Sequence, residues 1–143
     1  MKNKIKWVLV TTIVTLFSVQ GAYALSLKLK KEQKSTQEKI DKELTDIKKN
    51  CGCTPAVQID WESFKDKSDF PIASHNLQNI SSAMANVCKD FKAEVCKGIK
   101  TIKIGKGSSI SKSLKDGVLE EKIPAGNQSW GADQVQKLIE ENL

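Results

Sequence analysis

Residues 74–97, SHNLQNISSAMANVCKDFKAEVCK, carry the most regular apolar pattern in the sequence. Their apolar residues recur at the spacing of an α-helix: Leu77, Ile80, Met84, Val87, Cys88, Phe91 and Val95. At about 100° per residue these positions fall within an arc of about 100°. Ser74 is a suitable N-cap and Gly98 a suitable residue to end the helix. The pattern predicts one continuous helix over 74–97 with this stripe facing the core.

Two of the four cysteines lie in this predicted helix, and the other two lie in Cys51-Gly52-Cys53. Cys88 and Cys96 would stand roughly 12 Å apart along the helix axis. A disulfide requires Cα atoms within about 7 Å, so these two cannot pair in an unbroken helix. We therefore expect Cys51 and Cys53 each to form a bridge to the helix.

The pairing depends on chain direction. If the strand after Pro55 runs antiparallel to the helix, Cys51 lies nearest the helix C-terminus, which favours Cys51–Cys96 with Cys53–Cys88. The alternative, Cys51–Cys88 with Cys53–Cys96, stays open. Either pair of bridges would close long loops and stabilise a small core.

Cys51-Gly52-Cys53 also suggests two other functions, a thiol-disulfide motif or a copper(I) or zinc site. However, activated cysteines usually lie at a helix N-terminus, and this pair follows a charged, predicted helical segment. The second pair, separated by seven residues, does not match the usual zinc spacing. Structural disulfides are the favoured interpretation, and no metal or other cofactor is expected.

The remaining pattern predicts an α+β or α/β domain with about three strands and three helices. The other helices are expected over 34–49, where Ile40, Leu44 and Ile47 form a stripe, and over 132–143. Strands are expected over 55–61, 99–104 and 118–123, with a short helical turn over 60–65. Trp61, Phe64 and Trp130 are expected in or at the edge of the core. Residues 65–71, 105–117 and 124–131 are expected to be loops.

The N-terminus has the features of a secretory signal peptide. Lys2, Lys4 and Lys6 precede an uncharged apolar run over 7–19, and Ala22-Tyr23-Ala24 is a suitable cleavage site. The apolar run is shorter than the roughly 20 residues that span a bilayer. We expect cleavage after Ala24, a charged and partly exposed helix over 25–50, a disulfide-clasped domain over 51–143, and no membrane span in the processed chain.

The charge composition restricts the partners. Without the three signal lysines, 20 of the 23 basic residues remain against 17 acidic residues, a net charge of +3. Every basic residue is lysine, which lacks the bidentate fork with which arginine binds phosphates and base edges. Specific nucleic-acid binding is therefore not expected. Export and the even cysteine count favour the bacterial periplasm or secretion.

The lysines are concentrated in one region. Residues 97–115 contain six lysines and no acidic residue. Since exposed loops often carry function, we identify Lys103, Lys106, Lys112 and Lys115 as a candidate surface for a partner. A solvated charged face is the simpler interpretation of the same pattern.

Catalytic motifs are not evident. His75 is the only histidine, and Gly105-Lys106-Gly107 is too short for a phosphate-binding loop. The sequence favours a non-enzymatic, exported protein that binds another envelope protein, such as an inhibitor, immunity or accessory protein. The alternative is a thiol-disulfide or copper-handling protein that uses Cys51 and Cys53.

Overall fold

The structure is a computed structural model that describes residues 27–124 and 131–143. It has an α+β fold in which a four-stranded mixed sheet is packed with four helices, counted over those residues. The main elements are α1 (Leu27–Cys51), β1 (Ala56–Ile59), α2 (Phe70–Val87), α3 (Lys92–Gly98), β2 (Thr101–Lys106), β3 (Ser111–Lys115), β4 (Val118–Ile123) and α4 (Ala132–Asn142). Two short 3₁₀-helices lie between β1 and α2: Trp61–Ser63, where a helical turn was predicted, and Lys67–Asp69, where a loop was predicted. The predicted signal peptide and Trp130 lie outside the described residues.

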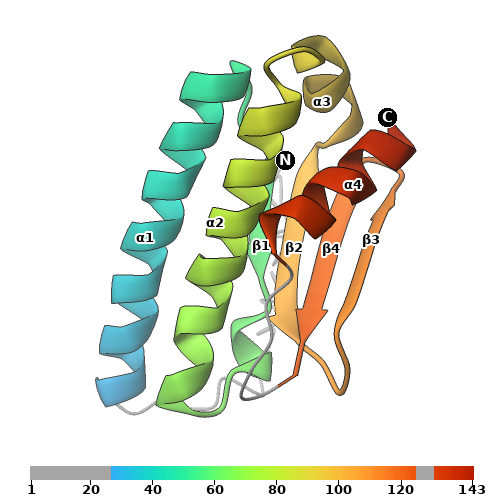
Figure 1. Cartoon of the computed structure of the whole chain (residues 1–143). Helices are drawn as coiled ribbons and strands as arrows, with labels where there is room; N and C mark the ends of the chain where they lie inside the picture. Colours follow the sequence, from blue (N-terminus) through green and yellow to red (C-terminus); the bar gives the residue numbers. More distant parts are fainter. Residues whose placement is uncertain (1–26, 125–130) are drawn as a thin grey trace, which may run out of the picture.

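The helices lie on one side of the sheet, with α1, α2 and α4 side by side (Figure 1). Helices α2 and α4 pack against each other and over the strands, and α1 packs on the outer side of α2. One core joins all of these elements. It contains Ile40 and Ile47 of α1, Leu77 and Ile80 of α2, and Ile102 of β2, each 0% exposed.

The strands follow the order β1-β2-β4-β3. Strands β1, β2 and β4 are parallel, whereas β3 is antiparallel to β4. Asp116 and Gly117 connect β3 to β4 with φ angles of 51° and 78°. Two central residues with positive φ are typical of the two-residue turn that matches strand twist, and Asp-Gly is a preferred pair for it.

Strand β3 corrects the prediction of a loop over 105–117. The segment Ser111–Lys115 reads SKSLK, with Leu114 as its sole apolar residue. A strand that pairs on one edge and has one face in water needs little apolar sequence. The count of three predicted strands was therefore one too low.

The predicted helix over 74–97 was wrong at its start and in its middle, whereas its predicted end lies within one residue of the end of α3 at Gly98. It begins at Phe70, because Pro71 fits the first turn of a helix, where its missing N–H is not needed. It ends at Val87, and a turn over 88–91 separates it from α3. Phe91, predicted in the core, is 53% exposed because the turn rotates it away from the α2 stripe. The break also makes a fourth helix.

Helix α1 differs from its prediction, whereas Trp61 and Phe64 lie at the edge of the core and in it, as predicted. Helix α1 extends from Leu27 to Cys51 and so is longer than the predicted 34–49. Trp61, Phe64 and Phe70 form an aromatic cluster with ring centroids 5.9–6.0 Å apart, in which Phe64 and Phe70 are buried. This cluster closes the core beneath the first turn of α2.

Candidate binding face

One face of the sheet is polar and has no described helix over it. Side chains alternate between the two faces of a strand, so alternate residues of each strand form this surface. Its central row runs across all four strands in register, from Gln58 to Lys103, Glu120 and Ser113. We call it the open sheet face and define it by Gln58, Lys103, Ser113, Lys115, Glu120 and Lys122.

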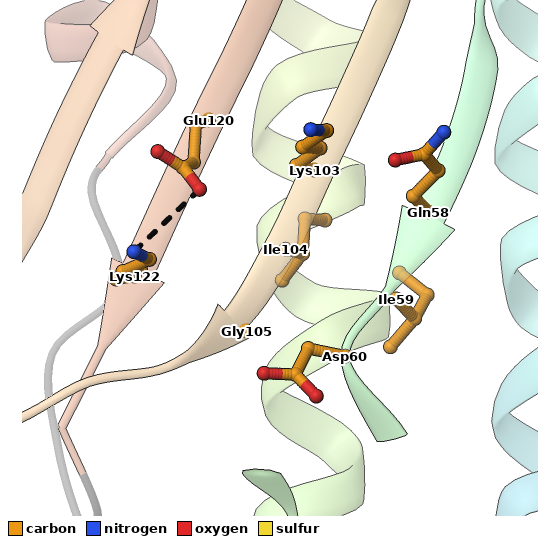
Figure 2. Close-up of a pocket in the computed structure, with 8 residues that line it drawn as sticks. All are labelled: Gln58, Ile59, Asp60, Lys103, Ile104, Gly105, Glu120 and Lys122. Atoms are coloured by element: carbon orange, nitrogen blue, oxygen red, sulfur yellow. Dashed lines mark ion pairs between the residues drawn. The ribbon is translucent and has the colours of Figure 1, made fainter. Parts of the chain in front are cut away.

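A hollow lies on this face where the parallel strands reach their carboxyl ends (Figure 2). Its volume is about 370 Å³. Its polar lining comes from Gln58 of β1, Asp60 directly after β1, Lys103 of β2, and Glu120 and Lys122 of β4. Gly105 keeps the floor low, because a Cβ there would lie 3.2 Å from Asp60 Cβ. The carboxyl ends of parallel strands are a common place for binding sites.

The charged groups on the face are weakly engaged. Lys122 Nζ lies 3.6 Å from Glu120 Oε1, and both side chains are about half exposed. A second hollow of about 280 Å³ lies beside the first and shares Lys103 and Glu120 with it. The face therefore presents ammonium, carboxylate, amide and hydroxyl groups side by side, as hydrogen-bonding partners for another polar surface.

The structure divides the four predicted partner lysines between the two faces of the sheet. Lys103 and Lys115 are exposed on the open sheet face. Lys106 and Lys112 lie on the helix-covered side and have partners within the fold. They do not form one loop surface, because residues 105–117 contain the end of β2 and all of β3.

Lys106 belongs to a structural ion pair. Its Nζ donates to both carboxylate oxygens of Asp69, at 3.0 and 2.9 Å, and Asp69 is 2% exposed. Asp69 Oδ2 also accepts the backbone N–H groups of Lys65 and Asp66. Burial alone would raise the pKa of Asp69, but the Lys106 hydrogen bond, these two N–H groups and the Lys106 charge together lower it. This pair joins the end of β2 to the start of α2.

Glu121 is the residue that sequence reasoning missed. It is 0% exposed, and neither carboxylate oxygen has a hydrogen-bond partner among the described residues. Burial raises its pKa to about 8, and the Lys112 charge opposes this shift. Lys112 is its partner in the β3–β4 register, and Lys112 Nζ donates to Gln134 O of α4 at 2.6 Å. The alternation of Leu119, Glu121 and Ile123 in a predicted strand was the available signal.

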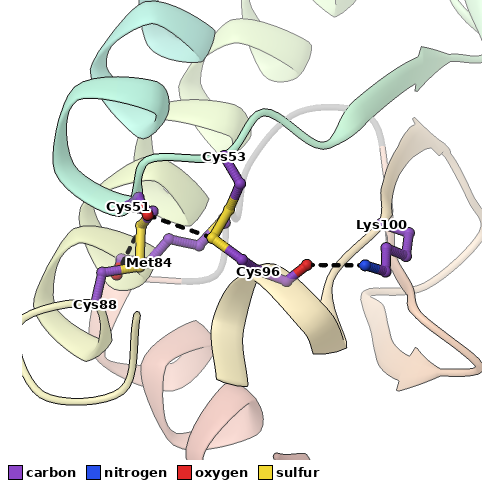
Figure 3. The surroundings of a disulfide bond; sticks show 6 residues. All are labelled: Cys51, Cys53, Met84, Cys88, Cys96 and Lys100. Atoms are coloured by element: carbon purple, nitrogen blue, oxygen red, sulfur yellow. Dashed lines mark hydrogen bonds between the residues drawn. A yellow bond between two sulfur atoms is a disulfide. The ribbon is translucent and has the colours of Figure 1, made fainter. Parts of the chain in front are cut away.

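The cysteines form two bridges, Cys51–Cys88 and Cys53–Cys96 (Figure 3). The favoured pairing was wrong and its alternative is correct, because the break after Val87 brings Cys88 to the end of α2 and places Cys96 in another helix. Gly52 has a φ of 80° and its N–H donates to Lys48 O at 2.8 Å. This left-handed residue ends α1 and separates the two sulfur atoms, so each cysteine reaches a different helix segment.

The bridges differ in exposure. Cys51 and Cys88 are 1% and 4% exposed, whereas Cys53 and Cys96 are half-buried. No cysteine of the chain is free. Two disulfides are typical of an oxidising compartment, such as the periplasm or the cell exterior.

The described residues contain no group of three or more His, Cys, Asp or Glu side chains placed to hold a metal ion. Over the same ranges, no helix combines the length and apolar character that a membrane crossing requires. No protein-family model, curated protein or solved structure matches the chain.

Proposed function

We propose that this protein is a small, exported, non-enzymatic binding protein whose partner is another protein of the cell envelope. The observation that carries the proposal is the open sheet face. Parallel strands are usually covered on both faces, yet β1, β2 and β4 are covered by described helices on one face alone. A partner that supplies the second cover would be an inhibited enzyme, a toxin or a larger assembly.

The chemistry of the face indicates the type of contact. Its residues are polar and carry both charges, and an aromatic side chain is absent from the six that define it. Such a surface suits a reversible, hydrogen-bonded interface more than an obligate apolar one. Export is supported by the signal-peptide pattern and by the two disulfides.

Crosslinking tests the proposal directly. A photo-crosslinking residue at Ser113, on the open sheet face, should give one dominant adduct in the cell envelope. The same residue at Lys42, exposed on α1, should give little. Replacement of Lys103, Lys115 and Lys122 by serine should abolish the Ser113 adduct. The matched control replaces Lys31, Lys42 and Lys49 of α1 by serine, which removes the same charge. Equal amounts of adduct from Ser113 and Lys42 would refute the proposal. A Ser113 adduct that persists after Lys103, Lys115 and Lys122 are replaced by serine would also refute it.

The alternative function is thiol-disulfide exchange or copper handling. It would have to act through Cys53–Cys96, because the other bridge is buried. Mass spectrometry of the exported protein, with and without reductant, decides between them. Two free thiols or a Cys51–Cys53 bridge would favour the alternative, and four oxidised cysteines in the observed pairs would favour a structural role.

A further inference from the structure

A third hollow, separate from the two on the open sheet face, lies at the opposite end of the molecule from the carboxyl ends of the parallel strands. It has a volume of about 480 Å³ and is lined by Val87 of α2, Phe91 and Glu94 at α3, and Glu140 and Leu143 at α4. Two of the three exposed large apolar side chains among the described residues are here, Phe91 at 53% and Leu143 at 43%. Clustered apolar exposure of this kind marks interaction sites.

The exposure of Phe91 follows from the helix break. Phe91 is the residue before α3, and its N–H donates to Val87 O at 2.9 Å, which fixes the turn. The ring therefore stands beside the hollow and not in the core. Val87, 4% exposed, forms an apolar floor.

The charges that line the hollow are both negative. Glu94 has no ion-pair partner among the described residues, and Glu140 accepts a hydrogen bond from Gln136 at 2.8 Å. The described residues that line the hollow include no lysine. The ammonium of Lys89 donates to Asn86 Oδ1 at 3.3 Å. The rim is therefore complementary to a positive group.

We propose that this hollow binds a cationic, apolar peptide segment, with an aromatic or aliphatic side chain of the segment against Phe91 and Leu143 and a flanking lysine or arginine beside Glu94 and Glu140. The volume suits one or two side chains. This site is separate from the open sheet face, so either proposal can fail while the other stands.

The test uses the full processed chain and three synthetic hexapeptides. They are Gly-Lys-Leu-Phe-Lys-Gly, its acidic counterpart Gly-Glu-Leu-Phe-Glu-Gly, and the non-apolar Gly-Lys-Ser-Ser-Lys-Gly. Titration followed by nuclear magnetic resonance should show shifts at Val87, Phe91 and Leu143 with the first peptide alone. Binding should weaken as salt is added, since the charges are exposed.

Two variants locate the contacts. Phe91→Ser should weaken binding about tenfold, as expected when a central aromatic contact is truncated. The double variant Glu94→Gln with Glu140→Gln keeps the apolar surface and should weaken binding about threefold while removing its salt dependence. It also remains informative if Phe91→Ser does not fold. The triple serine variant of Lys103, Lys115 and Lys122 should bind as the unmodified protein does. No shifts with the first peptide, or equal binding of the basic and acidic peptides, would overturn the proposal.

Discussion

Lys103 and Lys106 lie three residues apart on β2, and their side chains lie on opposite faces of the sheet. Lys103 is exposed on the open sheet face, while Lys106 lies on the helix-covered side and binds a carboxylate that is 2% exposed. Glu120 and Glu121 show the same contrast on β4, since one lies near solvent and the next is fully buried. The charged groups on the covered face are buried or have partners within the fold, whereas Lys103 and Glu120 on the open face are in contact with solvent.

The two disulfides also differ in burial, since Cys51–Cys88 is buried and Cys53–Cys96 is half-buried. Removing them should give the largest changes in stability. Cys51→Ala with Cys88→Ala should lower the free energy of unfolding by about 5 kcal/mol, since it opens a long loop and leaves a buried void. Cys53→Ala with Cys96→Ala opens a loop of similar length at a half-buried position, so it should cost about 3 kcal/mol. Urea unfolding measures both. Equal decreases in the free energy of unfolding would mean that the burial of Cys51–Cys88 adds nothing to its stabilising effect.

Glu121 predicts that the stability of the protein depends on pH. Its pKa is raised from 4.5 to about 8 in the folded protein. Between these two values the unfolded chain has lost the proton and the folded chain keeps it. Stability should therefore fall as pH rises, by about 1.4 kcal/mol per pH unit and about 4 kcal/mol from pH 5 to 8.

The control for this pH effect is the neighbouring carboxylate. Glu121→Gln should flatten the profile between pH 5 and 8, while Glu120→Gln should leave it unchanged. Denaturant unfolding at several pH values provides the data. A slope that persists in Glu121→Gln would assign the effect to another group.

Breaking the ion pair of Lys106 and Asp69 should lower the free energy of unfolding by less than removing the buried disulfide does. Asp69→Ala leaves Lys106 and two backbone N–H groups without their acceptor, and should cost about 3 kcal/mol. Because the folded pKa of Asp69 is lowered, its contribution is present above the unfolded value of 3.8 and is lost as pH falls through the folded value. In unfolding experiments, an Asp69→Ala variant as stable as the unmodified protein at pH 7 would contradict this role.

The smallest expected change is on the open face. Lys103→Ser, Lys115→Ser and Lys122→Ser together should change stability by less than about 0.5 kcal/mol, because exposed ion pairs contribute little. Circular dichroism melting curves test this. A large loss would show that these lysines stabilise the fold, and would remove the reason to assign them to a partner.

Much of the architecture could be predicted from the sequence. The patterns of residues 55–61, 99–104 and 118–123 predicted β1, β2 and β4, and the terminal stripe predicted α4. Strand β3 was missed because a serine- and lysine-rich edge strand lacks apolar alternation. The break before Phe91 was missed because Lys89 and Asp90 are compatible with a helix.

The candidate site was less predictable. A cluster of lysines in sequence says nothing about which face of a strand each occupies until the register is known. Once β2 was extended to Lys106, its alternation placed Lys103 outside and Lys106 inside. The cysteine pairing depended on the same helix break and so could not be decided from spacing.

The half-buried bridge, Cys53–Cys96, also shortens the covalent path between the edge strand β1 and its neighbour β2. Ala56 and Thr101 are register partners although 45 residues separate them in the sequence. Through Cys53–Cys96 the covalent path between them is only three residues on one side and five on the other. Closing a loop of fewer than ten residues costs about 1 kcal/mol less chain entropy than closing one of 45 residues, and sheets built from distant pairings fold slowly. Once Cys53–Cys96 has formed, β1 and β2 therefore pair across a short covalent connection.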